Sequence, residues 1–171
     1  AVNTELAQYG FVAAAKTMAS VELASSAAAS GTVSFSLVTP DSVEIGFSAT
    51  YESSNLSPLV TQINQRQAQT GVSAEVSSDG TRLILTQAEG LDISIKNGSG
   101  NALEVNSLDH NYNKLLTSDV SLDKATKVIG SLSFQSPRGF KVTSSNGQAQ
   151  SSGNLATRGG GASKSYAAAG T

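Results

Sequence analysis

The stretch Asn55 to Ile95, NLSPLVTQINQRQAQTGVSAEVSSDGTRLILTQAEGLDISI, decides the fold, because one helix pattern is followed by three strand patterns. Ser57-Pro58 is typical of a helix start, with Ser57 as the expected cap, and Gly71 is placed to end the helix with a positive φ. Four apolar residues at helical spacing predict its buried face: Leu56, Leu59, Val60 and Ile63. Four polar residues are predicted to face water: Gln62, Gln65, Arg66 and Gln69.

Three short alternating runs follow the helix. Residues 72–76 alternate as a strand, and Asp79-Gly80 is a favoured dipeptide for the turn of a hairpin. In 83–85 the two leucines share one face and Ile84 lies opposite, while Ile93 and Ile95 form a third strand. The helix is therefore expected to be followed by three antiparallel strands.

Two alternating runs also precede the helix. Residues 33–37 and 43–47 place apolar side chains on one face, and Pro40-Asp41-Ser42 joins them as a turn. Residues 32–96 thus have the order β-β-α-β-β-β. The predicted fold class is α+β: mostly antiparallel β, with one helix packed on the sheet and an additional small β segment.

Composition divides the chain into four parts. Residues 1–31 are an Ala-rich lead-in whose helix propensity favours a helix, although Gly10 interrupts it. Residues 32–97 form the α+β domain, and 98–145 are predicted to be a β-rich segment packed on or beside it. Residues 146–171 are predicted to be a flexible Gly/Ser-rich tail. Strand patterns in the third part lie at 128–134 and at 140–142.

Charge and residue usage exclude several function classes. The net charge is −2, charged residues make up 14% and no basic cluster is present, so a nucleic-acid partner is not expected. Cysteine is absent, which excludes disulfides, thiolate metal sites and a cysteine nucleophile. No apolar window reaches the roughly 20 residues that a membrane-spanning helix needs, so no membrane partner is expected.

His110 is the one histidine, and any metal or triad chemistry that uses histidine would depend on it. A metal site would combine Asp109 and His110 with Asp119 or Asp123. Their spacing does not recur as ligand spacing does, and no Gly-x-Ser-x-Gly sequence supports a triad. The interpretation favoured here is a polar loop.

Other polar patterns favour no site. Gly159 to Ser165 resembles a phosphate loop only superficially, because Ser163 stands where glycine should precede Lys164. Four glutamates are spread over strands and turns: Glu44, Glu52, Glu75 and Glu89. Asn55 and Asn97 match the acceptor pattern for N-linked sugars, which is common by chance. We therefore predict no catalytic, cofactor-binding or metal-binding residues and no cofactor.

A short motif carries a family resemblance. Eight residues define it: Ile63, Asn64, Thr70, Gly71, Val72, Asp79, Gly80 and Leu83. Their order resembles the IN motif of bacterial flagellins and flagellar hook-associated proteins. Ala49-Thr50-Tyr51, Ile129 to Phe134 and Gly139 to Ser144 resemble flanking strands of the same variable region, so the resemblance covers residues 32–145.

The resemblance implies a structural protein and not an enzyme. In that family, long terminal helices polymerise into the filament core and central domains project outward. The chain is similar to an excised central, variable region, so the resemblance implies an extracellular, secreted part of the flagellum that serves motility and forms an antigenic surface. Its partners would be other flagellin subunits in the full-length protein, and the isolated chain is expected to be a monomer.

Three alternatives stay open. A filament cap or a hook–filament junction protein would share the IN motif. A carbohydrate- or host-binding adhesin module is a second possibility, although the chain has no tryptophan and only 5% aromatic residues. An enzyme would need a pocket in which His110 or the glutamates converge.

Overall fold

The computed structural model describes residues 12–98, 103–115, 120–121, 125–135 and 164–167. These residues form two antiparallel sheets and one short, broken helix. The elements are β1 (Val12–Leu23), β2 (Ser30–Val38), β3 (Glu44–Glu52), α2 (Ser57–Gln65), α3 (Gln67–Thr70), β4 (Val72–Val76), β5 (Leu83–Gln87), β6 (Ile93–Asn97), β7 (Leu103–Ser107), β8 (Val120–Ser121), β9 (Ala125–Val128), β10 (Ser131–Gln135) and β11 (Lys164–Ala167).

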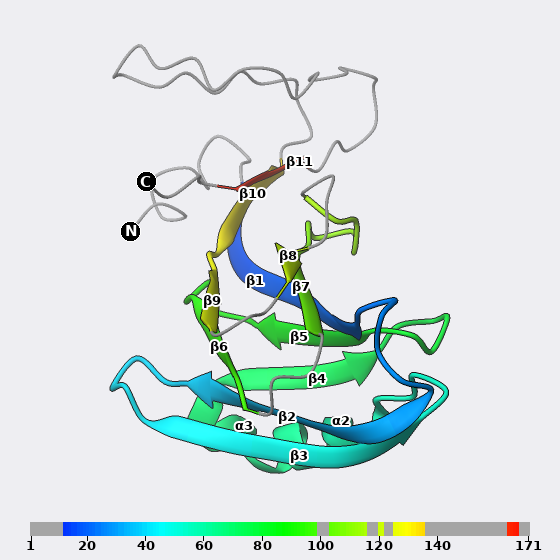
Figure 1. Ribbon diagram of the computed structural model, residues 1–171. Helices are drawn as coiled ribbons and strands as arrows, with labels where there is room; N and C mark the ends of the chain where they lie inside the picture. The colour runs from blue at the N-terminus through cyan, green and yellow to red at the C-terminus, as the bar shows by residue number, and fades with distance from the viewer. Residues whose placement is uncertain (1–11, 99–102, 116–119, 122–124, 136–163, 168–171) are drawn as a thin grey trace.

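The two sheets share no strand. One has the order β11-β10-β1-β5-β4, with β7 also paired to β1 and β8 paired to β7. The other has the order β3-β2-β6-β9. Figure 1 shows β2 and β3 running below β4 and β5, with the helix beside them. The predicted order β-β-α-β-β-β and the mostly antiparallel α+β class are confirmed.

The main core lies between the sheets. It takes alternate residues from β2, β3, β5 and β6, because inward-facing side chains recur at every second position of a strand. Phe35 of β2 and Phe47 of β3 are cross-strand partners whose ring centroids lie 5.9 Å apart. The fully buried members include Val33, Phe35, Leu37, Leu59, Ile63, Leu83, Leu85, Ile93, Ile95 and Leu103.

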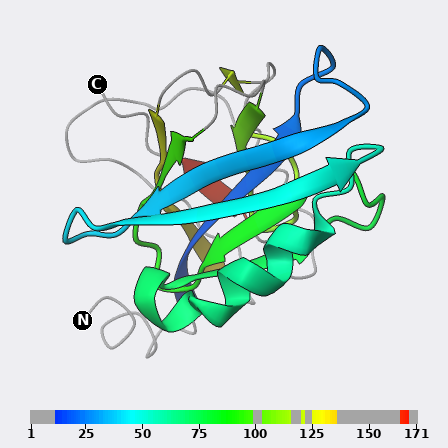
Figure 2. The same ribbon diagram turned by 60° about the horizontal axis from the view of Figure 1, so that its bottom comes forward.

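The strands after the helix divide between the two sheets. β4 and β5 pair as the predicted hairpin, with Ala74 opposite Leu85. β6 leaves them and pairs with β2, with Leu37 opposite Ile95. The helix consequently does not lie over the face of one sheet, as a single-sheet arrangement would require. The second layer against the β5 hairpin is the other sheet, and the helix packs at its side (Figure 2).

β1 corrects the prediction for residues 1–31. Helix propensity favoured a helix there, but residues 12–23 form the long strand β1. Its first half pairs with β10, and its second half lies between β5 and β7. Ala19 and Val21 belong to the main core, and Met18 packs on the opposite face with Ile84 and Leu108. Pairing on both sides outweighs the weak helix preference of an Ala-rich run.

The later part of the chain also pairs into these sheets. The predicted strand 128–134 is interrupted, because β9 ends at Val128 and β10 begins at Ser131. Gly130 lies between them, and a Cβ there would meet the carbonyl oxygen of Gly90. The predicted strand at 140–142 and most of the predicted tail lie outside the described residues. Within that tail, Lys164–Ala167 pair with β10 instead of forming a flexible segment.

Candidate functional site

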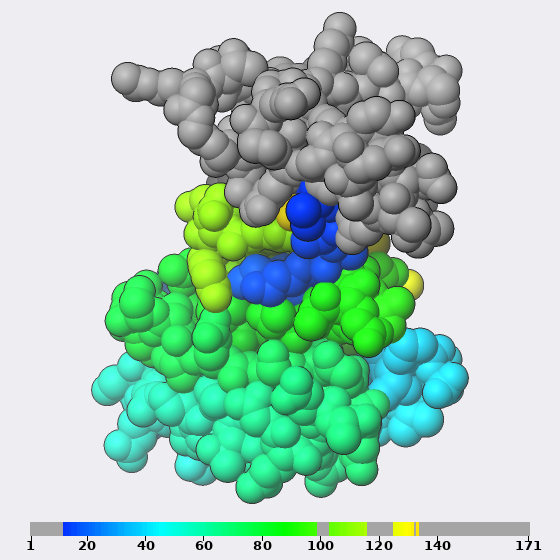
Figure 3. All heavy atoms as spheres, turned by 180° about the vertical axis from the view of Figure 1, so that it is seen from behind, coloured from blue at the N-terminus to red at the C-terminus, as the bar shows by residue number. Residues whose placement is uncertain are grey.

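The helix lies between the outer strands of the two sheets. β3 ends the order of one sheet and β4 ends the order of the other, so no described strand pairs with the outer side of either. α2 contacts both β3 and β4 (Figure 2). From behind, the blue-green surface of the helical segment spreads across the lower half of the described molecule (Figure 3). The helix thus occupies the position where two unpaired strand edges would meet water.

One face of α2 fills the core beneath these edges. Leu59 and Ile63 are fully buried, and Val60 packs at the border of the same cluster. Leu56, directly before the helix, is 1% exposed. The predicted apolar face is therefore confirmed. Burial of each such side chain contributes about 1.5–3 kcal/mol, so these residues hold the helix against both sheets.

Asn64 binds the free edge of β4. Its Nδ2 donates to the carbonyl oxygen of Ala74 at 2.9 Å, and its Oδ1 accepts the Ala74 N–H at 2.8 Å. A side-chain amide has the same donor and acceptor pair as a peptide group, so Asn64 takes the place of a neighbouring strand at this one position. Unpaired edge groups are templates for association with other chains, and this contact covers two of them.

Gln62 makes the equivalent contact with β3. Its Nε2 donates to the carbonyl oxygen of Ser48 at 2.9 Å, and its Oε1 lies 3.5 Å from the Ser48 nitrogen. Gln62 was predicted to face water; its side chain is half-buried and hydrogen-bonds to β3 at the surface. Two amides that are two residues apart thus hold opposite edges, with Ile63 between them in the core.

The segment Thr70-Gly71-Val72 turns the helix into β4. Gly71 has a φ of 70°, the left-handed conformation that was predicted, and its N–H donates to Gln67 at 2.7 Å. The hydroxyl of Thr70 accepts the Val72 N–H at 3.1 Å. A second outward-facing group of β4 is therefore satisfied by a side chain of the motif.

The turn between β4 and β5 is built on Asp79. Its Oδ1 accepts the Thr81 N–H at 3.0 Å and the Thr81 hydroxyl at 2.8 Å, together with the Ser77 hydroxyl. The hydrogen bond from Ser77, then those from Thr81 and the charge of Arg82, hold the pKa of the Asp79 carboxyl below its usual range. Gly80 follows with a φ of 74°, and Leu83 is fully buried at the start of β5.

Residues 32–89 match the family model described as the flagellin hook IN motif. This chain carries a flagellin IN motif. The match begins in β2 and ends after β5, and it includes the helix with both of its edge contacts. The resemblance is thereby confirmed over residues 32–89, and it supports a flagellin-type central region with a flagellin-related structural role. The predicted flanking segments 129–134 and 139–144 lie outside the match. A comparison with curated proteins finds no match to the chain.

The structure places the eight motif residues along the helix, around both ends of β4 and at the start of β5, in three small groups. Ile63 and Asn64 lie on the helix, Thr70 to Val72 at the helix–strand turn, and Asp79 to Leu83 around the hairpin turn. Each group shapes β4: one binds its edge, one starts it and one returns it to β5. The motif residues thus position β4 at the edge of its sheet and bind its unpaired backbone groups.

Two contributors to the IN motif were missed from the sequence. Gln62 is one, because a polar residue on a helix next to a buried Ile is ordinarily solvated. Asn55 is the other: its Oδ1 accepts the Ser57 N–H at 3.0 Å, while Ser57, the predicted cap, makes no capping hydrogen bond. An Asn two residues before the first helical residue was the available signal for this correction.

The histidine candidate lies in a turn far from the IN motif in sequence. Asp109 accepts the N–H groups of Asn111 and Asn113 at 2.7 and 2.9 Å. Burial raises the pKa of Asp109, but the hydrogen bonds from Asn113 and Asn111 outweigh it, so the net pKa is lowered. Asp109 therefore shapes the turn that carries His110. Asp119 and Asp123 lie outside the described residues.

The glutamates do not converge. Glu44 pairs with Lys96 at 2.7 Å on one sheet, and Glu75 lies on β4 of the other. A hydrogen bond to Glu75, followed by its charge, raises the pKa of Tyr112. Among the residues that the structure describes, no group of three or more acidic or histidine side chains could hold a metal ion. No described helix is long and apolar enough to cross a membrane.

Proposed function

We propose that this chain is the surface-exposed outer domain of a bacterial flagellin and forms part of the outside of the flagellar filament. The match of residues 32–89 to the IN motif carries this proposal. Exposure on the filament would make the domain part of its antigenic surface and place it outside the cell. Its partners in the full-length protein would be neighbouring flagellin subunits, and motility would be the process it serves.

The edge contacts support a role as a surface domain. Asn64 and Gln62 bind the outer strands of both sheets, which removes two positions for uncontrolled strand pairing between neighbouring domains. A filament brings many copies close together, so covered edges favour polymerisation only through the intended segments. The net charge of −2 and the Ser-rich strand surfaces fit a solvated module. We accordingly expect the isolated chain to be a monomer in sedimentation experiments.

A flagellar hook-associated protein is the second candidate, and the description of the matched motif, which names the hook, favours it. A filament cap and a hook–filament junction protein would both belong to this class. They would carry the same module but occur only at one end of the filament. The position of the domain along the organelle therefore separates the candidates.

Immunogold electron microscopy tests the proposal directly. Antibodies raised against the 171-residue chain would be applied to intact flagella from cells that produce the full-length protein. Gold along the whole filament supports the flagellin assignment. Gold confined to the tip assigns a cap protein, and gold at the filament base assigns a junction protein. Absence of label from flagella, with label elsewhere on the cell, would refute both flagellar assignments.

A further inference from the structure

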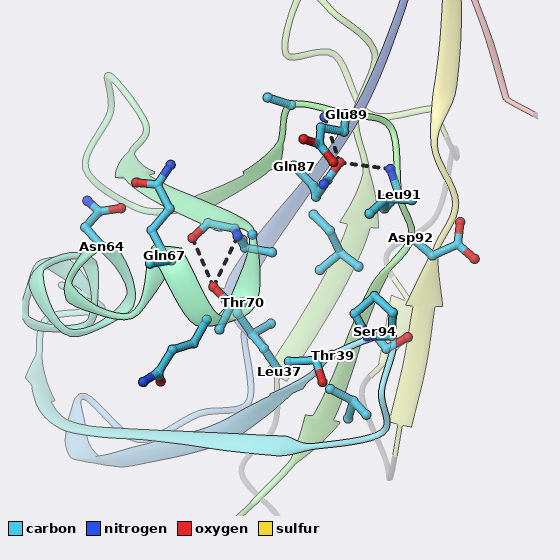
Figure 4. Close-up of a pocket in the computed structure, with 18 of the residues that line it drawn as sticks. Leu37, Thr39, Asn64, Gln67, Thr70, Gln87, Glu89, Leu91, Asp92 and Ser94 are labelled. Carbon is cyan, nitrogen blue, oxygen red and sulfur yellow. Dashed lines mark hydrogen bonds between the residues drawn. The ribbon is translucent and has the colours of Figure 1, made fainter.

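A cleft opens at one end of the fold, where the two sheets separate. It has a volume of about 710 Å³ and lies between the end of β2, α3 and the loop that joins β5 to β6 (Figure 4). Small-molecule sites commonly have volumes of about 300–1,000 Å³. Asn64 and Thr70, which make the β4 contacts described above, line part of this cleft. The cleft also contains a polar side chain that has hydrogen-bond partners at only one of its two polar atoms.

That side chain is Gln87, at the end of β5. It is 5% exposed, and its Oε1 accepts the N–H groups of Glu89 and Leu91 at 2.9 and 2.8 Å (Figure 4). Its Nε2 donates to no described residue. A Cβ built on Gly71 would lie 3.7 Å from this nitrogen, so the missing side chain of Gly71 leaves the amide accessible from the cleft. This nitrogen is therefore open to the cleft, where an acceptor atom of a ligand can form a hydrogen bond with it.

The wall that carries Gln87 is held in place from several sides. The Thr17 hydroxyl of β1 donates to the carbonyl oxygen of Leu91 at 2.7 Å. Gly90 lies against Ala15 so closely that no larger residue fits without movement. Both backbone polar groups of Leu91 are thus hydrogen-bonded, and its side chain is 49% exposed beside the cleft. A rigid wall lowers the entropic cost of binding a ligand.

The lining has a defined chemical character. The described residues that line the cleft include no Lys, Arg or His. Glu89 contributes a carboxylate, whereas the carboxylate of Asp92 points away from the cleft (Figure 4) and pairs with Lys127 at 3.3 Å. Anionic ligands are therefore disfavoured. The side chains of Gln67, Glu89 and Ser94 also make no hydrogen bond to another described side chain or backbone group, so donors and acceptors both remain available. Pro40 and Leu91 add an apolar surface.

We propose that this cleft binds a neutral saccharide. Sugar hydroxyls both donate and accept, which matches the mixture of amide, hydroxyl and carboxylate groups on the lining. The apolar face of a sugar ring can lie on Leu91 or Pro40, and a sugar oxygen can accept a hydrogen bond from Gln87 Nε2. Because no aromatic residue lines the cleft, binding should be weak, with a Kd of about 1 mM. The proposal does not depend on where the domain lies in a flagellum.

The test is a titration of the ¹⁵N-labelled 171-residue chain, followed by NMR. Chitotriose and maltotriose are the neutral probes, a galacturonic acid trimer is the anionic probe, and Ser-Gly-Ser-Gly is the peptide probe. We expect at least one neutral probe to shift the Gln87 side-chain amide and the backbone amides of Thr70 to Val72. The anionic trimer should cause no such shifts at about 10 mM, ten times the expected Kd.

Variants separate binding in the cleft from nonspecific contact. Gln87→Glu keeps the oxygen that accepts from Glu89 and Leu91 but removes the free donor, and it should weaken binding about tenfold, equivalent to about 1.4 kcal/mol. Ser94→Ala should weaken binding several-fold. It tests binding in the cleft even if the Gln87→Glu variant does not fold. Thr61→Ala, on the exposed side of α2, is the matched control and should bind as the wild type does.

Three results would overturn the proposal. The first is the absence of shifts around the cleft with both neutral probes. The second is equal binding by the wild type and by both cleft variants. The third is binding of the peptide or the anionic trimer in preference to the neutral sugars, because the lining would then recognise a different class of ligand.

Discussion

The side-chain amide of Asn64 and the backbone of Ala74 form a closed pair of hydrogen bonds, with Nδ2 donating at 2.9 Å and Oδ1 accepting at 2.8 Å. The pair joins a helix to the open side of β4. In the Ile-Asn dipeptide, Asn64 thus pairs with the backbone of an edge strand, and Ile63 is buried in the core.

Replacement of Asn64 by Ala should lower the free energy of unfolding by about 1–2 kcal/mol, because two hydrogen bonds are lost at a site that water can reach. Urea denaturation measures this change. The same variant should also self-associate more at high concentration, because the β4 edge is uncovered. Gln65→Ala is the matched control, since Gln65 is exposed and no hydrogen bond of its side chain is found among the described residues.

Asn64→Asp sharpens this test. A carboxylate still accepts the Ala74 N–H but repels the Ala74 carbonyl oxygen, whereas a protonated carboxyl can donate to it. The loss of stability relative to the wild type should therefore shrink as the pH falls below about 4. A loss that does not change between pH 7 and pH 3 would show that the amide does not pair with the edge.

Gly90→Ala should cost more than Gly71→Ala. Both glycines have positive φ, of 77° and 70°, and each alanine would lose about 1–2 kcal/mol for that conformation. A Cβ at Gly90 would also lie 2.5 Å from the Cβ of Ala15, while at Gly71 the nearest atom is 3.7 Å away. Overpacking of this kind adds about 1–3 kcal/mol. Thermal or urea unfolding of both variants gives the comparison.

A second substitution identifies the cause of the larger loss. In Gly90→Ala with Ala15→Gly, the colliding Cβ atom on β1 is absent, so part of the stability should return. Ala15→Gly alone should be mildly destabilising, because glycine weakens a strand. If Gly90→Ala lowered the free energy of unfolding equally with and without Ala15→Gly, β1 would not lie against this loop.

Asp79 should make the hairpin turn sensitive to acid. The native pKa is lowered by hydrogen bonds from Ser77 and Thr81, so the unfolded chain binds more protons in acid. The contribution of Asp79 is complete above its unfolded pKa, near about 4, and is lost as the pH falls toward the lowered native pKa. Asp79→Asn should therefore flatten the decline in unfolding free energy between pH 5 and pH 2, measured in urea.

Salt distinguishes the source of this effect. Hydrogen bonds come before the charge of Arg82 among the causes of the lowered pKa, and Arg82 lies 3.6 Å from Asp79. Added salt screens exposed charge pairs but leaves local hydrogen bonds in place. The pH dependence should thus persist at about 0.5 M NaCl. If salt abolished it, the Arg82 pair would be its source.

The elements between residues 30 and 97 were predictable because their patterns are local in the sequence. Alternation at period two located β2 to β6, and helical spacing located Leu56 to Ile63. Pairing across the fold was not predictable in the same way: the pattern of β6 is satisfied equally well beside β5 or beside β2. The division into two sheets depends on contacts that are distant in sequence.

β1 and the amide contacts were hidden for different physical reasons. β1 is covered on both faces, so residues 17–21 are buried consecutively and show no alternation between apolar and polar residues. Its small residues then favour a helix by propensity alone. Gln62 and Asn64 satisfy backbone groups of strands, and no pattern in a helix specifies which edge will lie beside it.

Removal of residues 1–29 provides the sharpest test of the domain boundary. The composition places an independent α+β domain at 32–97, so this deletion would be harmless if that boundary were real. In the structure, β1 lies between β5 and β7, and the deletion removes Met18, Ala19 and Val21 from two clusters. We expect the shortened chain to lack a cooperative unfolding transition. Addition of a peptide spanning 12–23 should restore dispersed NMR resonances, and a stably folded chain without the peptide would contradict the central position of β1.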